Sequence, residues 1–452
     1  MQEVKAIKET LCAKYRQTLR QIWRSELSAK NKVNATNMLA VPSLLYTFGA
    51  MKWNVNELQI LDRGTRKMMT INRSLHPKSS VPRIYLPRDL GGRGLIGLEY
   101  MHDRVVLSTA CRVFNSADPL LQLVKSHELT GAGAFLFQAA NRAADNLGLD
   151  LDFSLGGLGS NTSVLCRKAE DLKTSIKKAE QKILLKAHTD KAMHGSFYRG
   201  IETHGLSRDL TFAFLRSAGL KSETEGFVLA CQDGVINTLV YRRLIFGADV
   251  ADTACRACRS QPETLSHLLS GCGYYAKSAY IHRHNAALRV LYYHLRHRYG
   301  IDETPVLPYA PGDIESVVEN DKCKIWWNFS FSTTRQLSAT KPDIVLLDLG
   351  ARSMYVIEFS APAEANMEAK ERDKRTKYQD LLFELRQLYP GYSVKLVVLI
   401  IGVLGGVKDS LLASIKCIPA CEKAAYALAV KMQKAVLLGS MRLLRAHDPN
   451  SG

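Results

Sequence analysis

The stretch from residue 341 to residue 360 constrains the fold more than any other part of this chain. Two apolar runs, residues 344–347 and 355–357, flank a turn at residues 349–352. Two short apolar segments joined by so few residues predict a β-hairpin, and Gly350 supplies the permissive backbone that a tight turn needs. Because consecutive residues in the runs are apolar, both faces of the hairpin should be covered. We therefore expect it to lie within a buried sheet.

Two acidic residues fall opposite one another in this predicted hairpin. With the turn centred between Gly350 and Ala351, Asp343 pairs with Glu358, and directly opposed residues have Cβ atoms about 5 Å apart on one face. Two carboxylates that close repel each other, and their burial is costly without a cation. Because a hard divalent ion takes oxygen ligands, we predict that Asp343 and Glu358 share Mg²⁺. The alternative is that Asp343 is a turn residue after Pro342 and Glu358 merely ends a strand.

A long charged helix is expected next, over residues 364–389. It carries Lys370, Lys374 and Lys377. A lysine beside a metal-bound water orients that water and stabilises the charge that develops on a phosphate in the transition state. Most lysines on such a helix simply face solvent, so we expect at most one of these three to act in this way.

The hairpin and helix together resemble the PD-(D/E)xK nucleases, specifically the restriction-like endonuclease of site-specific non-LTR retrotransposons. The resemblance rests on Pro342 and Asp343, on Glu358, and on Lys374 in the following helix. The compact form of the motif has its lysine where this chain has Ser360, so the match is to the branch with a displaced lysine. It implies an α/β nuclease core, catalysis by Asp343, Glu358 and Lys374 with Mg²⁺, and cleavage of a DNA phosphodiester. The other two lysines of the helix remain alternatives.

A second motif combines three cysteines and one histidine. Its spacing is Cys255-x2-Cys258-x8-His267-x4-Cys272. Three thiolates and one imidazole make a closed tetrahedral zinc set, typical of structural sites. The alternative is four free side chains. The spacing resembles the Cys-Cys-His-Cys knuckle that precedes the nuclease in these elements, and with no coordination position left open, we predict a structural or nucleic-acid-binding role.

The formal net charge of +18 suits a polyanionic partner such as nucleic acid. Residues 1–130 are predicted to be helical. They resemble the reverse-transcriptase thumb and post-polymerase region of the same polyproteins, through the run at 61–67 and the Pro- and Gly-containing stretch at 75–95. The nucleic-acid contacts expected there are Arg63, Arg66, Lys67, Arg83, Arg88 and Arg93.

Basic and aromatic residues also interleave over residues 280–299, a pattern that suits backbone contacts and base stacking. Arg283, His284 and Arg289 are predicted to contact nucleic acid, and the run from Arg283 to Asn285 resembles a family motif. The paired metal-binding aspartates of a polymerase palm are missing, because no Asp-Asp dipeptide occurs in the chain. We therefore expect no polymerase activity from this chain alone.

The predicted fold is multidomain, with α and α/β parts. The expected segments are a thumb-like helical region at 1–130, a linker and helical region at 131–250, the knuckle and basic helix at 251–300, the nuclease core at 320–404, and C-terminal helices at 405–452. The leading function is a metal-dependent, nicking DNA endonuclease fragment of a retrotransposon polyprotein that lacks the palm. The alternative is a non-catalytic nucleic-acid-binding remnant or a host-adapted retrotransposon protein. The expected partners are target DNA and element RNA or an RNA–DNA duplex, with the oligomeric state open.

Cysteine usage and hydropathy bear on location. Ten cysteines are scattered without a dense, even framework, which predicts a reducing compartment with free or metal-bound thiols. The N-terminus is charged from Glu3 onwards, so it does not read as a signal peptide. The longest apolar run, between Lys395 and Lys408, is too short to span a membrane. We therefore expect no membrane partner and a nuclear location.

Overall fold

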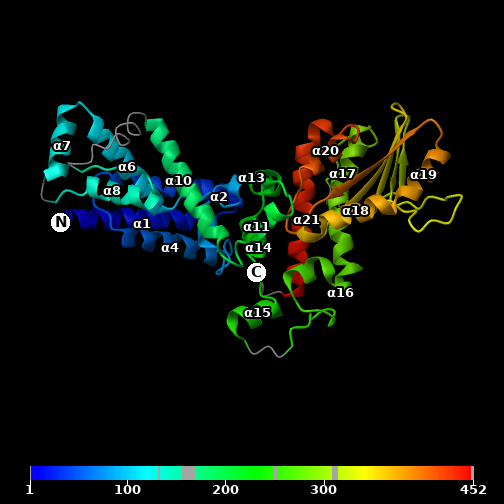
Figure 1. Ribbon diagram of the computed structural model, residues 1–452, viewed down its shortest axis with the longest axis horizontal. Coiled ribbons are helices and arrows are strands. Elements are labelled where there is room, and N and C mark those ends of the chain that lie inside the picture. The colour runs from blue at the N-terminus through cyan, green and yellow to red at the C-terminus, as the bar shows by residue number, and fades with distance from the viewer. Residues whose placement is uncertain (1, 131–132, 155–168, 249–251, 308–313, 449–452) are drawn as a thin grey trace. The chain divides into compact units, whose positions relative to one another are not determined.

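The computed structural model describes residues 2–130, 133–154, 169–248, 252–307 and 314–448. It divides into two compact units (Figure 1). The first comprises residues 1–195 with 220–226, and the second comprises residues 196–219 with 227–452. The linker expected at 155–161 lies outside the described residues, as does the start of the one expected at 131–133.

The first unit is helical throughout its regular structure, as predicted for residues 1–130. Its apolar helix faces enclose two cores, one around Trp23, Phe48 and Leu58 and the other around Leu107, Phe137 and Ile176. The elements are α1 (Gln2–Arg24), α2 (Ala29–Ala35), η1 (Thr36–Ala40), α3 (Pro42–Phe48), α4 (Val55–Ile71), α5 (Val81–Tyr85), η2 (Arg88–Leu90), α6 (Leu98–Asn115), α7 (Pro119–Thr130), α8 (Leu136–Leu147) and α10 (Ala169–Thr189).

The second unit combines helices with one five-stranded sheet. The helix α14 (Ser222–Gln232) begins in the segment that belongs to the first unit and continues into the second. The remaining helices are α11 (Ser196–Thr203), α12 (Arg208–Thr211), α13 (Ala213–Ser217), α15 (Leu239–Phe246), η3 (His267–Gly271), α16 (Gly273–Ala276), α17 (Ala279–Arg298), η4 (Glu364–Asn366), α18 (Met367–Lys377), α19 (Gln379–Leu388), α20 (Ser410–Lys416), η5 (Glu422–Ala424) and α21 (Ala425–His447).

The strands lie in the sheet in chain order, from β1 to β5. The first four pair antiparallel, and β5 pairs parallel to β4. The segment between β4 and β5 therefore crosses from one end of the sheet to the other, and it does so through α18 and α19. The strands are β1 (Val317–Glu319), β2 (Cys323–Trp327), β3 (Ile344–Asp348), β4 (Ser353–Ser360) and β5 (Ser393–Ile400).

The predicted hairpin is confirmed as β3 and β4. The register pairs Ile344 with Ile357 and Asp348 with Ser353, so its centre falls between residues 350 and 351 as expected. The role given to Gly350 was wrong, because the left-handed backbone conformation is at Arg352, with φ of 45°. An aspartate stabilises this turn, since Asp348 Oδ1 accepts a 2.9 Å hydrogen bond from the N–H of Ala351.

Both faces of the sheet are covered, as the continuous apolar runs predict. Ile344, Leu346 and Ile357 pack into a core shared with α17, α20 and α21. Their neighbours Val345 and Val356 point the other way, into a core shared with α19. By this alternation, Glu358 belongs to the face that α18 and α19 cover. The helix expected over 364–389 is divided into α18 and α19 at the buried Tyr378.

Helices α17 and α21 pack closely at Gly439 of α21, which lies against Arg283 of α17. A Cβ atom added at Gly439 would lie 2.8 Å from both Cβ and Cγ of Arg283 and 3.1 Å from its Cα. Such distances are below van der Waals contact, so any side chain at this position would push the two helices apart. The Arg283 side chain that fills this contact then reaches Ser440 Oγ at 3.2 Å.

We predict that Gly439→Ala destabilises the second unit by about 1–3 kcal/mol, because it overpacks a fixed contact between two helices. Thermal unfolding measures the effect as a fall in Tm. Gly200→Ala, within α11, is the matched control, since its added Cβ makes only ordinary contacts at 3.5 Å or more. Equal Tm changes in the two variants would contradict the proposed close approach.

The thiols and helices also bear on the expectations about location. Of the described cysteines, Cys111 is an exception to the expectation of free or metal-bound thiols, because it is disulfide-bonded. Of the helices in the described part of the chain, none is long and apolar enough to cross a lipid bilayer.

Candidate functional site

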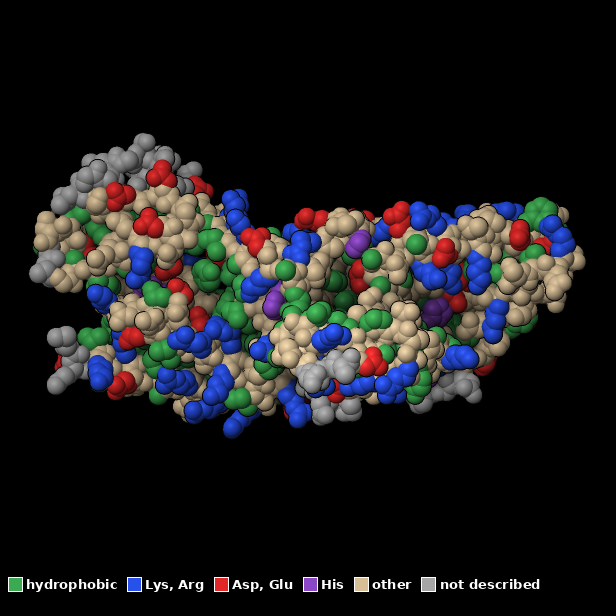
Figure 2. Space-filling model, turned by 60° about the horizontal axis from the view of Figure 1, so that its bottom comes forward, with side chains coloured by type: hydrophobic (Ala, Val, Ile, Leu, Met, Phe, Trp, Pro, Cys, Tyr) green, Lys and Arg blue, Asp and Glu red, His purple; other side chains and the backbone are tan. Residues whose placement is uncertain are grey.

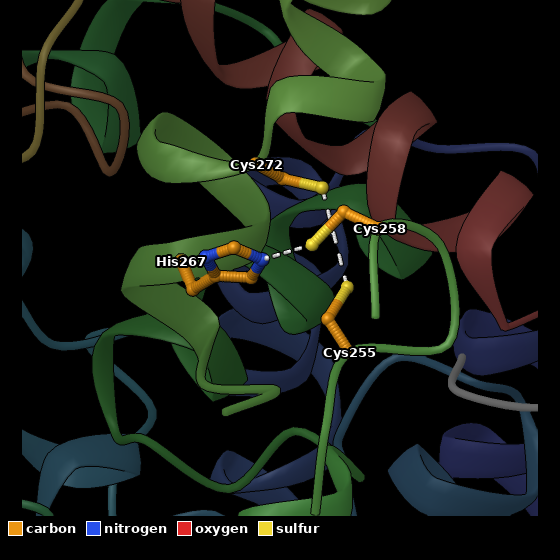
Figure 3. Close-up of side chains that lie close together, drawn as sticks. All are labelled: Cys255, Cys258, His267 and Cys272. Carbon is orange, nitrogen blue, oxygen red and sulfur yellow. Dashed lines mark hydrogen bonds between the residues drawn. The ribbon is translucent and has the colours of Figure 1, made fainter. Parts of the chain in front are cut away.

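The four predicted zinc ligands converge in the second unit (Figure 3). Their ligand atoms all lie within 4.8 Å of one another. The Sγ atoms of Cys255 and Cys272 are 4.0 Å apart, and Cys258 Sγ is 3.3 Å from His267 Nε2. Sulfur atoms on a tetrahedral zinc ion are separated by about 3.8 Å, given bonds of about 2.3 Å. The four side chains are therefore spaced to bind one zinc ion, with Nε2 as the ligand atom of His267.

The thiols differ in how readily they ionise before a metal binds. Hydrogen bonds from Ser260 lower the pKa of Cys258 to about 6, whereas burial raises the pKa of Cys272 to about 11. Zinc ligation requires thiolates, so proton release accompanies metal binding.

A buried carboxylate holds the knuckle in place. Glu263 accepts hydrogen bonds from the backbone N–H groups of Leu239 and Arg256, at 3.1 and 3.0 Å, and from the guanidinium of Arg256. Its Oε2 also lies 2.9 Å from His447 Nε2, at the end of α21. Burial alone would raise the pKa of Glu263, but the bonds from His447 and Arg256 outweigh it, so the pKa is well below its ordinary value. Glu263 therefore remains charged and joins the zinc loop to α15 and α21.

We predict that the purified protein carries about one zinc per chain and that Cys258→Ser loses it, because a serine hydroxyl does not replace a thiolate ligand. Elemental analysis of the two proteins measures this. Cys417→Ser is the matched control, since Cys417 is an exposed, free cysteine. The same zinc content in wild type and Cys258→Ser would rule out this ligand set.

Of the two predicted acidic residues, Asp343 immediately precedes β3 and Glu358 lies near the end of β4. One further step along the register that pairs Ile344 with Ile357 brings Asp343 opposite Glu358. The N–H of Asp343 donates a 3.0 Å hydrogen bond to Glu358 Oε1, and the N–H of Phe359 donates one of 2.8 Å to Asp343 Oδ2. The Glu358 carboxylate is thus held by the backbone of Asp343, and the Asp343 carboxylate is held by the backbone of Phe359, the residue after Glu358. Glu358 is fully buried, and Asp343 is 9% exposed.

Of the three lysines on α18, the structure brings Lys374 to this site. Its Nζ donates a hydrogen bond of 2.5 Å to Glu358 Oε2. Lys370 instead lies 3.6 Å from Asp373 Oδ2 on its own helix, and Lys377 donates to the hydroxyl of Tyr378 at 3.3 Å. The geometry therefore favours Lys374 among the three candidates.

His284 also belongs to the carboxylate site. Its Nε2 lies 3.1 Å from Asp343 Oδ2 and 3.2 Å from the carbonyl oxygen of Phe359. Because both of these oxygens only accept, Nε2 carries a proton and donates to them. The sequence predicted a nucleic-acid contact for His284, and that role stays a prediction; the structure adds its hydrogen bond to Asp343. The only sequence signal for this contact was the motif of three residues that contains His284, since 59 positions separate it from Asp343.

Burial and neighbouring charges shift the pKa values of His284, Asp343 and Glu358 in opposing ways. Burial lowers the pKa of His284, but the hydrogen bond and charge of Asp343 outweigh it and raise the pKa. For Asp343, burial raises the pKa, but His284 and Lys374 lower it below its ordinary value. For Glu358, burial and the charge of Asp343 outweigh Lys374, and the pKa is raised. Asp343 is therefore the more acidic carboxyl of the pair, as expected when two neighbouring acids have different partners.

Three of the six predicted nucleic-acid contacts in the first unit are structural residues. Arg83 and Arg93 are 2% and 1% exposed. Arg83 Nε donates to the carbonyl oxygen of Gly91 at 3.0 Å, and Arg93 pairs with Glu225 at 3.3 Å. Arg88 makes a two-pronged bond to the same carboxylate, at 2.7 and 3.1 Å. The prediction that these three arginines contact nucleic acid was wrong, because their guanidinium groups are engaged within the unit.

The predicted residues on α4 differ among themselves. Arg63 and Lys67 are exposed, while Arg66 is partly buried and donates a 2.5 Å hydrogen bond to the hydroxyl of Tyr85. Arg63 and Lys67 therefore remain available to a partner.

On α17, burial removes a further candidate. Arg283 is 3% exposed, and its guanidinium donates to Ser440 Oγ at 3.2 Å and to the carbonyl oxygen of Ala361 at 3.4 Å. Its predicted role in nucleic-acid contact was wrong for the same reason as that of Arg83. Arg289 is partly buried.

Comparison with known proteins does not assign the chain. No protein-family model matches it, and no curated protein matches it either. Function is therefore inferred from the motifs and from the geometry of the two sites.

Proposed function

We propose that this chain is a Mg²⁺-dependent DNA endonuclease that nicks one strand, derived from a non-LTR retrotransposon polyprotein and acting in the nucleus. The observation that carries the proposal is the grouping of Asp343, Glu358 and Lys374, since two acids on neighbouring strands and a lysine from the following helix are the parts of the PD-(D/E)xK motif. The flanking zinc knuckle fits the same element type.

The donor set suits Mg²⁺ in kind and number. Among the described residues, only the Cys and His cluster brings three or more potential side-chain ligands close enough to share an ion. Asp343 and Glu358 thus act as a pair without a third such ligand, and Mg²⁺ is commonly bound through one or two carboxylates together with water and substrate phosphate oxygens. When bound, the ion would polarise the phosphate and lower the pKa of the attacking water.

The surrounding side chains prepare the carboxylates for that ligand role. The Phe359 N–H and His284 both bond Asp343 Oδ2, so that carboxylate is held in one orientation. Lys374 pairs with Glu358 at 2.5 Å, so its ammonium group lies beside one of the two carboxylates that would hold the ion. The ammonium group would orient the water and stabilise the charge that develops on the phosphate.

The catalytic proposal predicts that Asp343→Asn and Glu358→Gln each abolish nicking of supercoiled plasmid in Mg²⁺ while DNA binding is retained. Lys374→Ala should slow nicking about 100- to 1,000-fold, because it removes one charge-stabilising group. Lys370→Ala is the matched control on the same helix and should nick at the wild-type rate. Plasmid relaxation is followed on gels, with EDTA as the metal-free reaction.

Two outcomes would contradict parts of this proposal. If Lys370→Ala loses activity and Lys374→Ala keeps it, the assignment of the lysine is wrong, although the carboxylate pair stands. If nicking by the wild type is insensitive to EDTA, or survives both carboxylate substitutions, the metal-dependent mechanism is wrong.

A second candidate function is non-catalytic nucleic-acid binding. One observation favours it: both oxygens of Glu358 are already engaged, Oε1 by the Asp343 N–H and Oε2 by Lys374. A buried acid that serves only to stabilise the fold would have its hydrogen bonds satisfied in the same way. The net charge of +18 supports binding in either case. On the face seen in Figure 2, Lys and Arg side chains are spread over the surface with Asp and Glu between them.

We predict that affinity for DNA falls steeply with salt and that Arg63→Ala combined with Lys67→Ala reduces the slope of log affinity against log salt by about 2, since each phosphate contact contributes about 1. Lys416→Ala with Lys423→Ala is the charge-matched control, because both lysines are exposed but lie on other elements. If the slope of log affinity against log salt is the same as that of the wild type in both double variants, α4 is not part of the DNA-binding surface.

A further inference from the structure

Helix α17 makes contacts with both sites from its first turns. Tyr280 lies on the first turn and reaches the zinc loop, and His284, one helical turn later, reaches the carboxylate site. Residues one turn apart on a helix move together, because the backbone hydrogen bonds between them leave little freedom. The two sites are thus connected by a single turn of helix within one compact unit.

The contact at the zinc end involves three backbone groups of the loop. The hydroxyl of Tyr280 donates towards the carbonyl oxygens of His267 and Leu268, at 3.2 and 2.8 Å, and accepts from the N–H of Cys272 at 3.0 Å. Two of these three residues are zinc ligands. The position of the tyrosine oxygen is therefore set by the conformation that the loop adopts when its ligands converge.

The residue between these two contacts strengthens the connection. The Arg283 guanidinium lies 4.9 Å from the centre of the Tyr280 ring, within the range of a cation–π contact. It also donates to the carbonyl oxygen of Ala361, just after β4. The same helical turn thus contacts the end of the strand that carries Glu358 and Phe359.

At the other end, His284 acts on Asp343. Its Nε2 donates to Asp343 Oδ2 and to the carbonyl oxygen of Phe359, which joins the start of β3 to the end of β4. Without this donor, Asp343 Oδ2 would keep only the N–H of Phe359 among the partners described above.

We propose that the zinc centre controls the geometry of the carboxylate site through α17: the metal-ordered loop fixes Tyr280, the helix carries that position to His284, and His284 holds Asp343 in the orientation needed for ligation. His284 is a positioning residue in this scheme. Its effect on nicking rests on the proposed nuclease function, whereas the structural link between the sites does not.

Hydrogen exchange of backbone amides tests the link without any active-site metal or DNA. Peptides that cover residues 341–345 and 357–361 report on the amides of Asp343 and Phe359. Tyr280→Phe, which removes one oxygen and keeps the ring, should speed their exchange about 10-fold, as expected for the loss of one hydrogen bond. Tyr274→Phe is the matched control, because Tyr274 is 64% exposed. Removal of zinc from the wild type with a chelator should have the same effect as Tyr280→Phe.

Variants of the histidine separate its role from general stability. His284→Ala should speed exchange in the same two peptides with zinc content unchanged, and His284→Gln, whose amide restores a donor, should recover most of the protection. His282→Ala is the control, since His282 is an exposed neighbour on the same helix. In the nicking assay, His284→Ala should be about 10- to 100-fold slower, as for the loss of an orienting partner of a metal ligand.

The outcomes are distinguishable. Faster exchange in both Tyr280→Phe and His284→Ala supports the structural link between the zinc loop and the carboxylate site. If the wild type also fails to nick DNA, that link stands and the nuclease proposal is wrong. Unchanged exchange in Tyr280→Phe and in the zinc-free protein overturns the link, whether or not the wild type nicks. Faster exchange in His284→Ala alone also overturns it, because His284 would then act without the zinc centre.

Discussion

The ion pair between Lys374 and Glu358 is the interaction on which the end of the sheet depends. Glu358 has no exposed surface, and removal of one partner of a buried pair typically costs about 3–5 kcal/mol. The pair requires α18 to lie over the last residues of β4, and the division of the helix at Tyr378 lets α19 pack on the same face. The crossover that makes β5 parallel to β4 is thus fixed by a charge as well as by apolar contacts.

The second acid is stabilised in a different manner. Asp343 precedes β3 and obtains its partners from the opposite layer, through His284 on α17, and from the backbone of β4. Two acids that share one face are therefore supported by helices on two different sides of the sheet. Each carboxylate thus has its own side-chain donor, His284 for Asp343 and Lys374 for Glu358, and their pKa values move in opposite directions.

Local pattern was enough to predict the hairpin, its register and the convergence of the three cysteines and His267, because each of these depends on residues close together in the sequence. The helical character of residues 1–130 followed from spacing in the same way. The roles of single arginines did not. Arg83, Arg93 and Arg283 read as surface cations, and their burial is decided by distant partners such as Glu225 and Ser440. The place of His284 likewise depends on how α17 packs on the sheet, which no local pattern specifies.

The segment at 220–226 has a consequence for how the chain can be divided. The polypeptide leaves the first unit after residue 195, and residues 220–226 belong to that unit again. In this segment Glu225 forms ion pairs with Arg88 and Arg93, and the hydroxyl of Ser222 is hydrogen-bonded to that of Ser74. A single protease cut within residues 196–219 would separate residues 220–226 from the rest of the first unit in sequence. The first unit would then stay complete only while the C-terminal fragment remained bound to it. A truncated gene product ending at 195 would lack Glu225, the carboxylate that pairs with Arg88 and Arg93. Dissection of this protein into independently expressed halves therefore needs a rejoined sequence, with residues 220–226 grafted behind residue 195, rather than a simple boundary.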